Sequence, residues 1–92
     1  MNRTHHVLVV EDDPVSRQTL AAYLRKDNHR VSEVENGEAM RRVFAGGDVA
    51  VVLLDINLPG EDGLSLLREL RRQSEVGIIM VTGRDDQVDR IV

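Results

Sequence analysis

Short apolar runs alternate along the chain with segments in which apolar residues recur every three or four positions. The short runs predict strands, and the recurring spacing predicts amphipathic helices. The predicted strands cover residues 7–10, 30–34, 49–55 and 77–81, and the predicted helices cover residues 14–26, 38–45 and 64–73. Because strands and helices alternate, we expect a parallel sheet with helices on both faces, joined by right-handed crossovers.

Local signals support these helix boundaries. Asp13 and Asp62 are suited to the N-caps of the first and third helices, and Gly46 is suited to the end of the second. One more amphipathic turn at Val88 predicts the start of a fourth helix. The apolar stripes that the first three helices would bury are Leu20, Tyr23 and Leu24, then Met40, Val43 and Phe44, then Leu64, Leu67 and Leu70.

Asp55 ends an otherwise wholly apolar run, residues 49–55. A run of this kind predicts a strand that is buried on both faces, and the run at 77–81 predicts another. The carboxylate of Asp55 would lie at the carboxyl edge of the sheet, where open α/β sheets bind ligands. Because a charge in apolar surroundings is costly unless it is paired, Asp55 needs a partner, most simply a cation.

Composition narrows the possible classes of protein. Ninety-two residues with 41% hydrophobic and 30% charged side chains predict at most one globular domain. The absence of cysteine excludes disulfides and thiolate metal sites and fits a reducing compartment. No apolar stretch predicts a membrane helix or a signal peptide, so we expect a cytoplasmic protein. The net charge of −4 argues against nonspecific nucleic-acid binding by this segment.

Polar residues follow three of the predicted strands at the same edge of the sheet. They are Glu11, Asp12 and Asp13 after the first strand, Asp55 and Asn57 after the third, and Thr82 and Gly83 after the fourth. Converging carboxylates repel one another without a cation, and hard oxygen ligands match Mg²⁺. A metal beside a carboxylate, with a hydroxyl nearby, is suited to phosphoryl transfer, in which an Asp can itself be the nucleophile.

Each of these residues also has an ordinary structural explanation. Asp13 can act only as a helix cap, Glu11 and Asp12 can be solvated loop charges, and Asp55 can cap the loop that follows it. The joint pattern favours a functional site, because every member falls at a carboxyl strand end.

The matching pieces of a known family are residues 7–12, residues 53–63 with the pattern D-x-x-L-P-x-x-D-G, and residues 80–83. On these pieces the whole chain resembles the receiver domain of bacterial two-component response regulators, most closely the OmpR/PhoB subfamily and its anaerobic-respiration regulators. The resemblance implies a flavodoxin-like (CheY-like) three-layer α/β sandwich with strand order 2-1-3-4-5. It also implies a signalling switch rather than an enzyme, one that controls an output such as transcription.

The resemblance assigns roles to particular residues. Asp55 would accept a phosphoryl group from the phosphohistidine of a sensor histidine kinase. Asp12 and Asp55 would bind Mg²⁺ directly, Asn57 through its backbone carbonyl and Glu11 through water. Thr82 would sense the phosphoryl group, and the side chains of Asn57 and Arg84 would tune the lifetime of the phosphorylated state.

The chain departs from the family after Thr82. The family continues with a complete fourth helix, a fifth strand followed by a phosphate-binding lysine, and a fifth helix, whereas the single lysine here, Lys26, lies in a distant predicted helix. We therefore expect residues 1–92 to be a receiver fragment that ends at the start of the fourth helix, without strand five, helix five or any DNA-binding effector domain. The DNA-binding role would then belong to the full-length protein.

Two alternatives stay open at this point. Strand 77–81 would be an open sheet edge, which could make the chain an interaction module that dimerises or exchanges elements, with little or no phosphorylation. A Mg²⁺-dependent phosphohydrolase is the other alternative. It is disfavoured because position 57 is Asn, so Asp55 does not begin a D-x-D motif.

Overall fold

The computed structural model describes residues 4–81 and 88–91 of the chain. In this part of the chain, the elements follow the order β1 (His6–Val10), α1 (Pro14–Lys26), β2 (Arg30–Val34), α2 (Gly37–Ala45), β3 (Val51–Asp55), α3 (Gly63–Gln73), β4 (Gly77–Val81) and β5 (Val88–Ile91). The first three predicted helices and the four predicted strands are present, with ends shifted by at most two residues.

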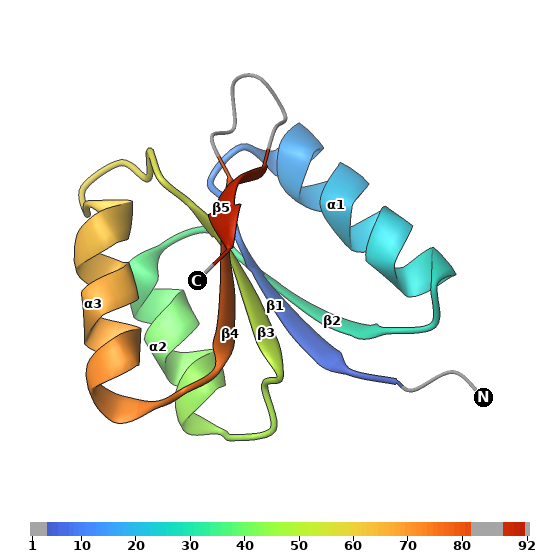
Figure 1. Ribbon diagram of the computed structural model, residues 1–92. Coiled ribbons are helices and arrows are strands. Elements are labelled where there is room, and N and C mark those ends of the chain that lie inside the picture. The colour runs from blue at the N-terminus through green and yellow to red at the C-terminus, as the bar shows by residue number, and fades with distance from the viewer. Residues whose placement is uncertain (1–3, 82–87, 92) are drawn as a thin grey trace.

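Strands β2, β1, β3 and β4 lie side by side in that order and run parallel. Helix α1 covers one face of this sheet, and α2 and α3 cover the other (Figure 1). These three layers confirm the expected flavodoxin-like α/β architecture. The carboxyl ends of β1 and β3 are neighbours, because Val10 is paired with Leu54.

The core on the α2–α3 side is aliphatic. Its largest fully buried side chains come from alternate strand positions and from the two helices, and they include Leu8, Leu54, Ile78, Met80, Met40, Leu66 and Leu70. A smaller cluster on the other face packs Val7, Val9 and Leu53 against Leu20 and Leu24 of α1. The two-sided burial predicted for β3 is therefore confirmed, and β1 is buried on both faces as well.

Burial of β4 is one-sided, which corrects the prediction for this strand. Ile78 and Met80 are fully buried, whereas Ile79 and Val81 are only half-buried. Ile79 belongs to the α1 face of the sheet. It is partly exposed because α1 packs mainly over β1 and β2.

The buried stripes of two helices also differ from the prediction. Tyr23 on α1 is 77% exposed, although its spacing from Leu20 and Leu24 places it near them. On α3, Leu66 and Leu70 are buried, and Leu64 is 40% exposed. The apolar residues of this short helix allow more than one buried face. Packing against the sheet selects the face that carries Leu66 and Leu70, which are four positions apart.

Residues 88–91 form a strand, so the helix start predicted at Val88 is wrong. β5 pairs antiparallel with β4, with Ile79 opposite Ile91 and a register shift between Met80 and Val81. Pairing of residues 88–91 with β4 satisfies backbone groups of the β4 edge. The predicted open edge of β4 is thus occupied. The parallel fifth strand of the family is missing from the part of the chain that the structure describes.

Candidate functional site

Three carboxylates converge at the carboxyl edge of the sheet. Each of Glu11, Asp12 and Asp55 offers an oxygen, and these oxygens all lie within 4.8 Å of one another. Glu11 and Asp12 directly follow β1, and Asp55 is the last residue of the neighbouring β3. The predicted meeting of these side chains is therefore confirmed, and they are named the carboxylate cluster below.

The carboxylate cluster is buried on one side and accessible on the other. Glu11 and Asp55 are each 3% exposed, and they are the buried polar side chains among residues 4–81. Asp12 is the more accessible of the three. A group that approaches from solvent would therefore meet Asp12 first and the two buried carboxylates behind it.

Burial changes the acidity of Glu11. Loss of water around the side chain, together with the neighbouring carboxylates of Asp55 and Asp12, raises the pKa of Glu11 from 4.5 to about 7. The backbone amide of Asp13 opposes this shift by donating a hydrogen bond of 3.1 Å to Glu11 Oε2. Near neutral pH the cluster therefore holds excess negative charge, which a proton or a cation relieves.

The loop after β3 is folded closely around Asp55. The backbone amide of Asn57 donates to Asp55 Oδ1 over 3.0 Å, and the amide of Ile56 donates to the carbonyl of Val81 over 3.0 Å. These two bonds fix both the carboxylate and the strand end that carries it.

Gly63 allows helix α3 to start beside this strand end. A Cβ atom at position 63 would lie 2.6 Å from the carbonyl oxygen of Asp55 and 2.8 Å from the Cα of Ile56. Gly63 lies inside the D-x-x-L-P-x-x-D-G pattern, which by itself predicts no role for it. The signal was a glycine directly after the Asp62 cap, whose carboxylate accepts a 3.1 Å hydrogen bond from the amide of Leu64.

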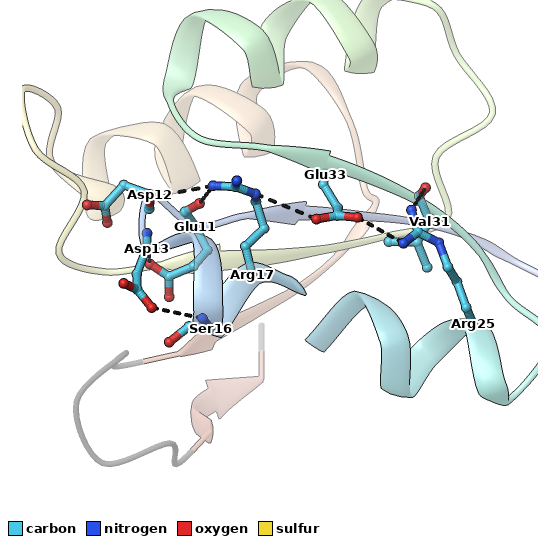
Figure 2. Close-up of polar contacts among 8 residues, drawn as sticks. All are labelled: Glu11, Asp12, Asp13, Ser16, Arg17, Arg25, Val31 and Glu33. Atoms are coloured by element: carbon cyan, nitrogen blue, oxygen red, sulfur yellow. Dashed lines mark hydrogen bonds and ion pairs between the residues drawn. The ribbon is translucent and has the colours of Figure 1, made fainter. Parts of the chain in front are cut away.

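Arg17 is a second residue that sequence reasoning missed. Its Nη1 donates to the backbone carbonyl of Glu11 over 3.0 Å and to that of Asp12 over 3.4 Å, and its Nε lies 3.6 Å from Glu33 Oε1 (Figure 2). A polar residue on an amphipathic helix normally suggests a solvated position. The role of Arg17 is not visible in the sequence, because it depends on where β2 places Glu33.

Asp13 acts as the N-cap of α1, as predicted. Its Oδ2 accepts a 2.8 Å hydrogen bond from the amide of Ser16, and this bond lowers the pKa of Asp13. The side chain of Asp13 therefore caps α1, and Asp13 is next to the carboxylate cluster but not part of it.

Other predicted site residues are placed only in part. The amide of Asn57 contacts Asp55, and metal binding by its backbone carbonyl stays a prediction. Thr82 and Arg84 lie outside the residues that the structure describes, as does Gly83. The donor set present in the carboxylate cluster consists of hard carboxylate oxygens, and this fits a divalent cation such as Mg²⁺.

The sequence profile of the response regulator receiver domain matches residues 7–92. The chain belongs to this family. It is thus a receiver domain of two-component signalling and not a classical enzyme. No helix in the described part of this receiver is long and apolar enough to cross a membrane.

Similar proteins include transcriptional regulators. The receiver is 48% identical over 88 residues to the TorCAD operon regulator TorR of Escherichia coli K12, covering 96% of this chain and 38% of TorR. It is 42% identical to the aerobic respiration control protein ArcA of the same strain, covering 98% of this chain and 38% of ArcA. The chain thus spans well under half the length of these relatives. TorR and ArcA are OmpR/PhoB regulators, which confirms the predicted subfamily.

Solved receiver structures agree with the fold. The receiver domain of TorR superposes with a TM-score of 0.82 at 46% identity, covering 94% of this chain and 72% of that one. TrrA of Thermotoga maritima, solved in complex with Mg²⁺ and a beryllium fluoride, gives a TM-score of 0.82 at 33% identity, covering 90% and 76%. Another structure shows TrrA bound to the histidine kinase ThkA.

Proposed function

We propose that Asp55 is the phosphoacceptor of this receiver and that a sensor histidine kinase is the donor. The supporting observation is the carboxylate cluster, in which Asp55 is 3% exposed yet lies within 4.8 Å of the more accessible Asp12. A buried carboxylate beside other carboxylates is held ready for a cation and for an electrophile that approaches along the accessible side. The solved complex of TrrA with a histidine kinase supports the class of donor.

The proposed transfer is a displacement at phosphorus. An oxygen of Asp55 attacks the phosphorus of a phosphohistidine, a P–O bond forms as the P–N bond breaks, and the imidazole nitrogen keeps the electron pair. The amide of Asn57, which donates to Asp55 Oδ1, orients the carboxylate so that the other oxygen is the one that reacts. The product is an aspartyl phosphate, which adds nearly one further negative charge to the site.

Mg²⁺ is the proposed cofactor. Asp12 and Asp55 would hold it directly, Glu11 through water, and Asn57 through its backbone carbonyl. When bound, the ion would neutralise charge on the carboxylates and on the phosphoryl oxygens. The complex of TrrA with Mg²⁺ and beryllium fluoride supports this choice of ion.

The remaining roles belong to the same proposal. Thr82 would donate a hydrogen bond to the phosphoryl group, and the side chains of Asn57 and Arg84 would set how long it persists. The output would be transcription, exerted in the cytoplasm by a full-length protein with a DNA-binding region, since TorR is a transcriptional regulator. The competing role as an interaction module stays an alternative, with β5 and not β4 as the outer strand at that side of the sheet.

Binding of beryllofluoride tests the proposed site. Amide NMR shifts of residues 11–13 and 55–57 are expected to change on addition of beryllofluoride with Mg²⁺, and to change little with beryllofluoride alone. Asp55→Asn should abolish this response, whereas Asp27→Asn, at a side chain that is 85% exposed, should retain it. Equal responses of wild type and Asp55→Asn would exclude Asp55 as the acceptor.

A further inference from the structure

We infer that Arg17, held by Glu33, is a positioning residue that sets the geometry of the carboxylate cluster through the backbone. This inference rests on the proposed Mg²⁺-dependent function. It assigns a role to Arg17, which is not itself one of the proposed metal ligands. Arg17 lies on α1, one turn after the N-cap Asp13. Helical side chains lean toward the N-terminus of their helix, so the guanidinium of Arg17 reaches back over the loop that carries the cluster.

Arg17 contacts the carbonyl groups of three consecutive residues. Its Nη1 donates to the carbonyls of Glu11 and Asp12, over 3.0 and 3.4 Å. Its backbone amide donates to the carbonyl of Asp13 over 2.9 Å. The side chain is only 17% exposed, so these bonds are partly shielded from competing water. The guanidinium therefore holds the carbonyls of Glu11 and Asp12, and the first helical hydrogen bond of α1 holds that of Asp13.

The peptide planes of residues 11–13 determine where two of the three carboxylates point. The amide of Glu11 donates to the carbonyl of Val34 over 3.0 Å, so β2 fixes the segment from one side and Arg17 fixes it from the other. Carboxylates as close as those of Glu11 and Asp55 repel each other. Without the Arg17 side chain, this repulsion would push residues 11–13 away from Asp55. A cation would then have to reorganise this segment when it binds.

Glu33 holds the guanidinium in place. Arg17 Nε lies 3.6 Å from Glu33 Oε1, and Arg25 Nη1 donates to Glu33 Oε2 over 2.9 Å, so one carboxylate lies between two arginines (Figure 2). Arg25 also donates to the carbonyl of Val31 over 3.1 Å. The two arginines thus share Glu33 as a partner, whereas the side-chain bonds of Arg25 are made to Glu33 and Val31 of β2.

The guanidinium is needed for its shape as well as its charge. It presents donors in several directions from one plane, so Arg17 can bond two carbonyls and face Glu33 at once. A lysine keeps the positive charge but offers a single ammonium on a flexible stem. Arg17→Lys therefore keeps the positive charge at position 17 and removes the guanidinium that bonds the two carbonyls. Arg25→Lys is the matched control, because it removes the other guanidinium that contacts Glu33.

The test is the Mg²⁺ dissociation constant of the whole chain, measured by titration calorimetry. Arg17→Lys is expected to weaken Mg²⁺ binding about tenfold, as loss of groups that orient metal ligands does. Arg25→Lys is expected to stay within about twofold of wild type. Equal affinities for the two variants would overturn the inference. If Arg17→Lys does not fold, Glu33→Ala replaces it, and an affinity equal to that of Arg25→Lys would again contradict the role.

Amide hydrogen exchange without metal separates this inference from the proposed function. If the wild type does not bind Mg²⁺, the proposed function fails, and exchange at the Asp13 amide still reports on Arg17. Exchange at Asp13 should be faster in Arg17→Lys than in Arg25→Lys, because that amide bonds the Glu11 carboxylate within the segment. The same exchange rate in both variants would show that Arg17 has only a general structural role.

Discussion

The carboxylates of Glu11 and Asp55 lie within 4.8 Å of each other at the end of two paired strands, and each side chain is 3% exposed. Such a pair destabilises the fold unless a proton or a cation reduces its charge. The position of the pair therefore links the stability of the domain to the proposed chemistry of its site.

Removing one of these charges should stabilise the metal-free protein. We expect Asp55→Asn to raise the free energy of unfolding by about 2 kcal/mol, because the repulsion with Glu11 disappears. Asn also keeps an oxygen that can accept from the Asn57 amide. Urea unfolding in the presence of a chelator measures this change. The exposed Asp27→Asn serves as control, and a loss of stability in Asp55→Asn would contradict the repulsion.

Stability without metal should fall as the pH rises from about 4.5 to about 7. The pKa of Glu11 is about 7 in the folded protein and 4.5 as its ordinary value, so the folded state binds more protons across this interval. Proton uptake on folding makes stability decrease with increasing pH. Thermal unfolding across this range, compared with that of Glu11→Gln, isolates the contribution, which the variant should lack.

Mg²⁺ should oppose this trend, because its stabilising effect should grow as Glu11 loses its proton near pH 7. A cation at the carboxylate cluster favours the charged form of Glu11, so the metal should raise the melting temperature more at pH 8 than at pH 6. An equal increase at both values would indicate that Glu11 does not take part in binding.

Gly63→Ala should destabilise the domain by about 2–3 kcal/mol. The added Cβ would lie 2.6 Å from the carbonyl oxygen of Asp55 and would push α3 away from the end of β3. Gly46→Ala is a suitable control, because Gly46 has an ordinary φ of −69° at the end of α2. Urea unfolding of the two variants should separate them clearly, and similar values would mean that the loop after Asp55 adapts easily.

Arg41 joins three elements on the α2–α3 side of the sheet. Its Nη2 lies 2.6 Å from Glu61 Oε2, and its Nε lies 2.7 Å from Glu69 Oε2. These two carboxylates raise the pKa of Arg41, and Arg41 in turn lowers the pKa of Glu69.

Replacing Arg41 by Met should therefore cost about 1 kcal/mol, since it breaks a network and not a single pair. Arg42→Met, which loses only an exposed pair with Glu38 at 3.5 Å, should cost less than half as much. Denaturation at low and at high salt measures both, and the difference should shrink as salt screens the network.

Much of the fold could be predicted because local pattern and tertiary packing agree. The apolar run that ends at Asp55 predicts a buried strand, and parallel strands bring its carboxyl end to Glu11 and Asp12. The caps at Asp13 and Asp62 were also predictable, because capping depends on residues only a few positions away in the sequence.

The features that could not be predicted depend on distant contacts. Arg17 has a role only because β2 places Glu33 beside α1 and because residues 11 and 12 lie within reach of its guanidinium. The buried stripe of α3 uses Leu66 and not Leu64, a choice made by the sheet surface. β5 forms because the backbone edge of β4 is available, whereas the spacing of Val88 and Ile91 alone indicated a helix.

The most direct test of the account is phosphorylation with acetyl phosphate, followed by intact mass and peptide mapping. We expect one added phosphoryl group, located on Asp55, formed only with Mg²⁺ and absent in Asp55→Asn. A phosphoryl group that maps elsewhere in the wild type, or one that forms equally well in Asp55→Asn, would contradict the assignment of Asp55 as the phosphoacceptor.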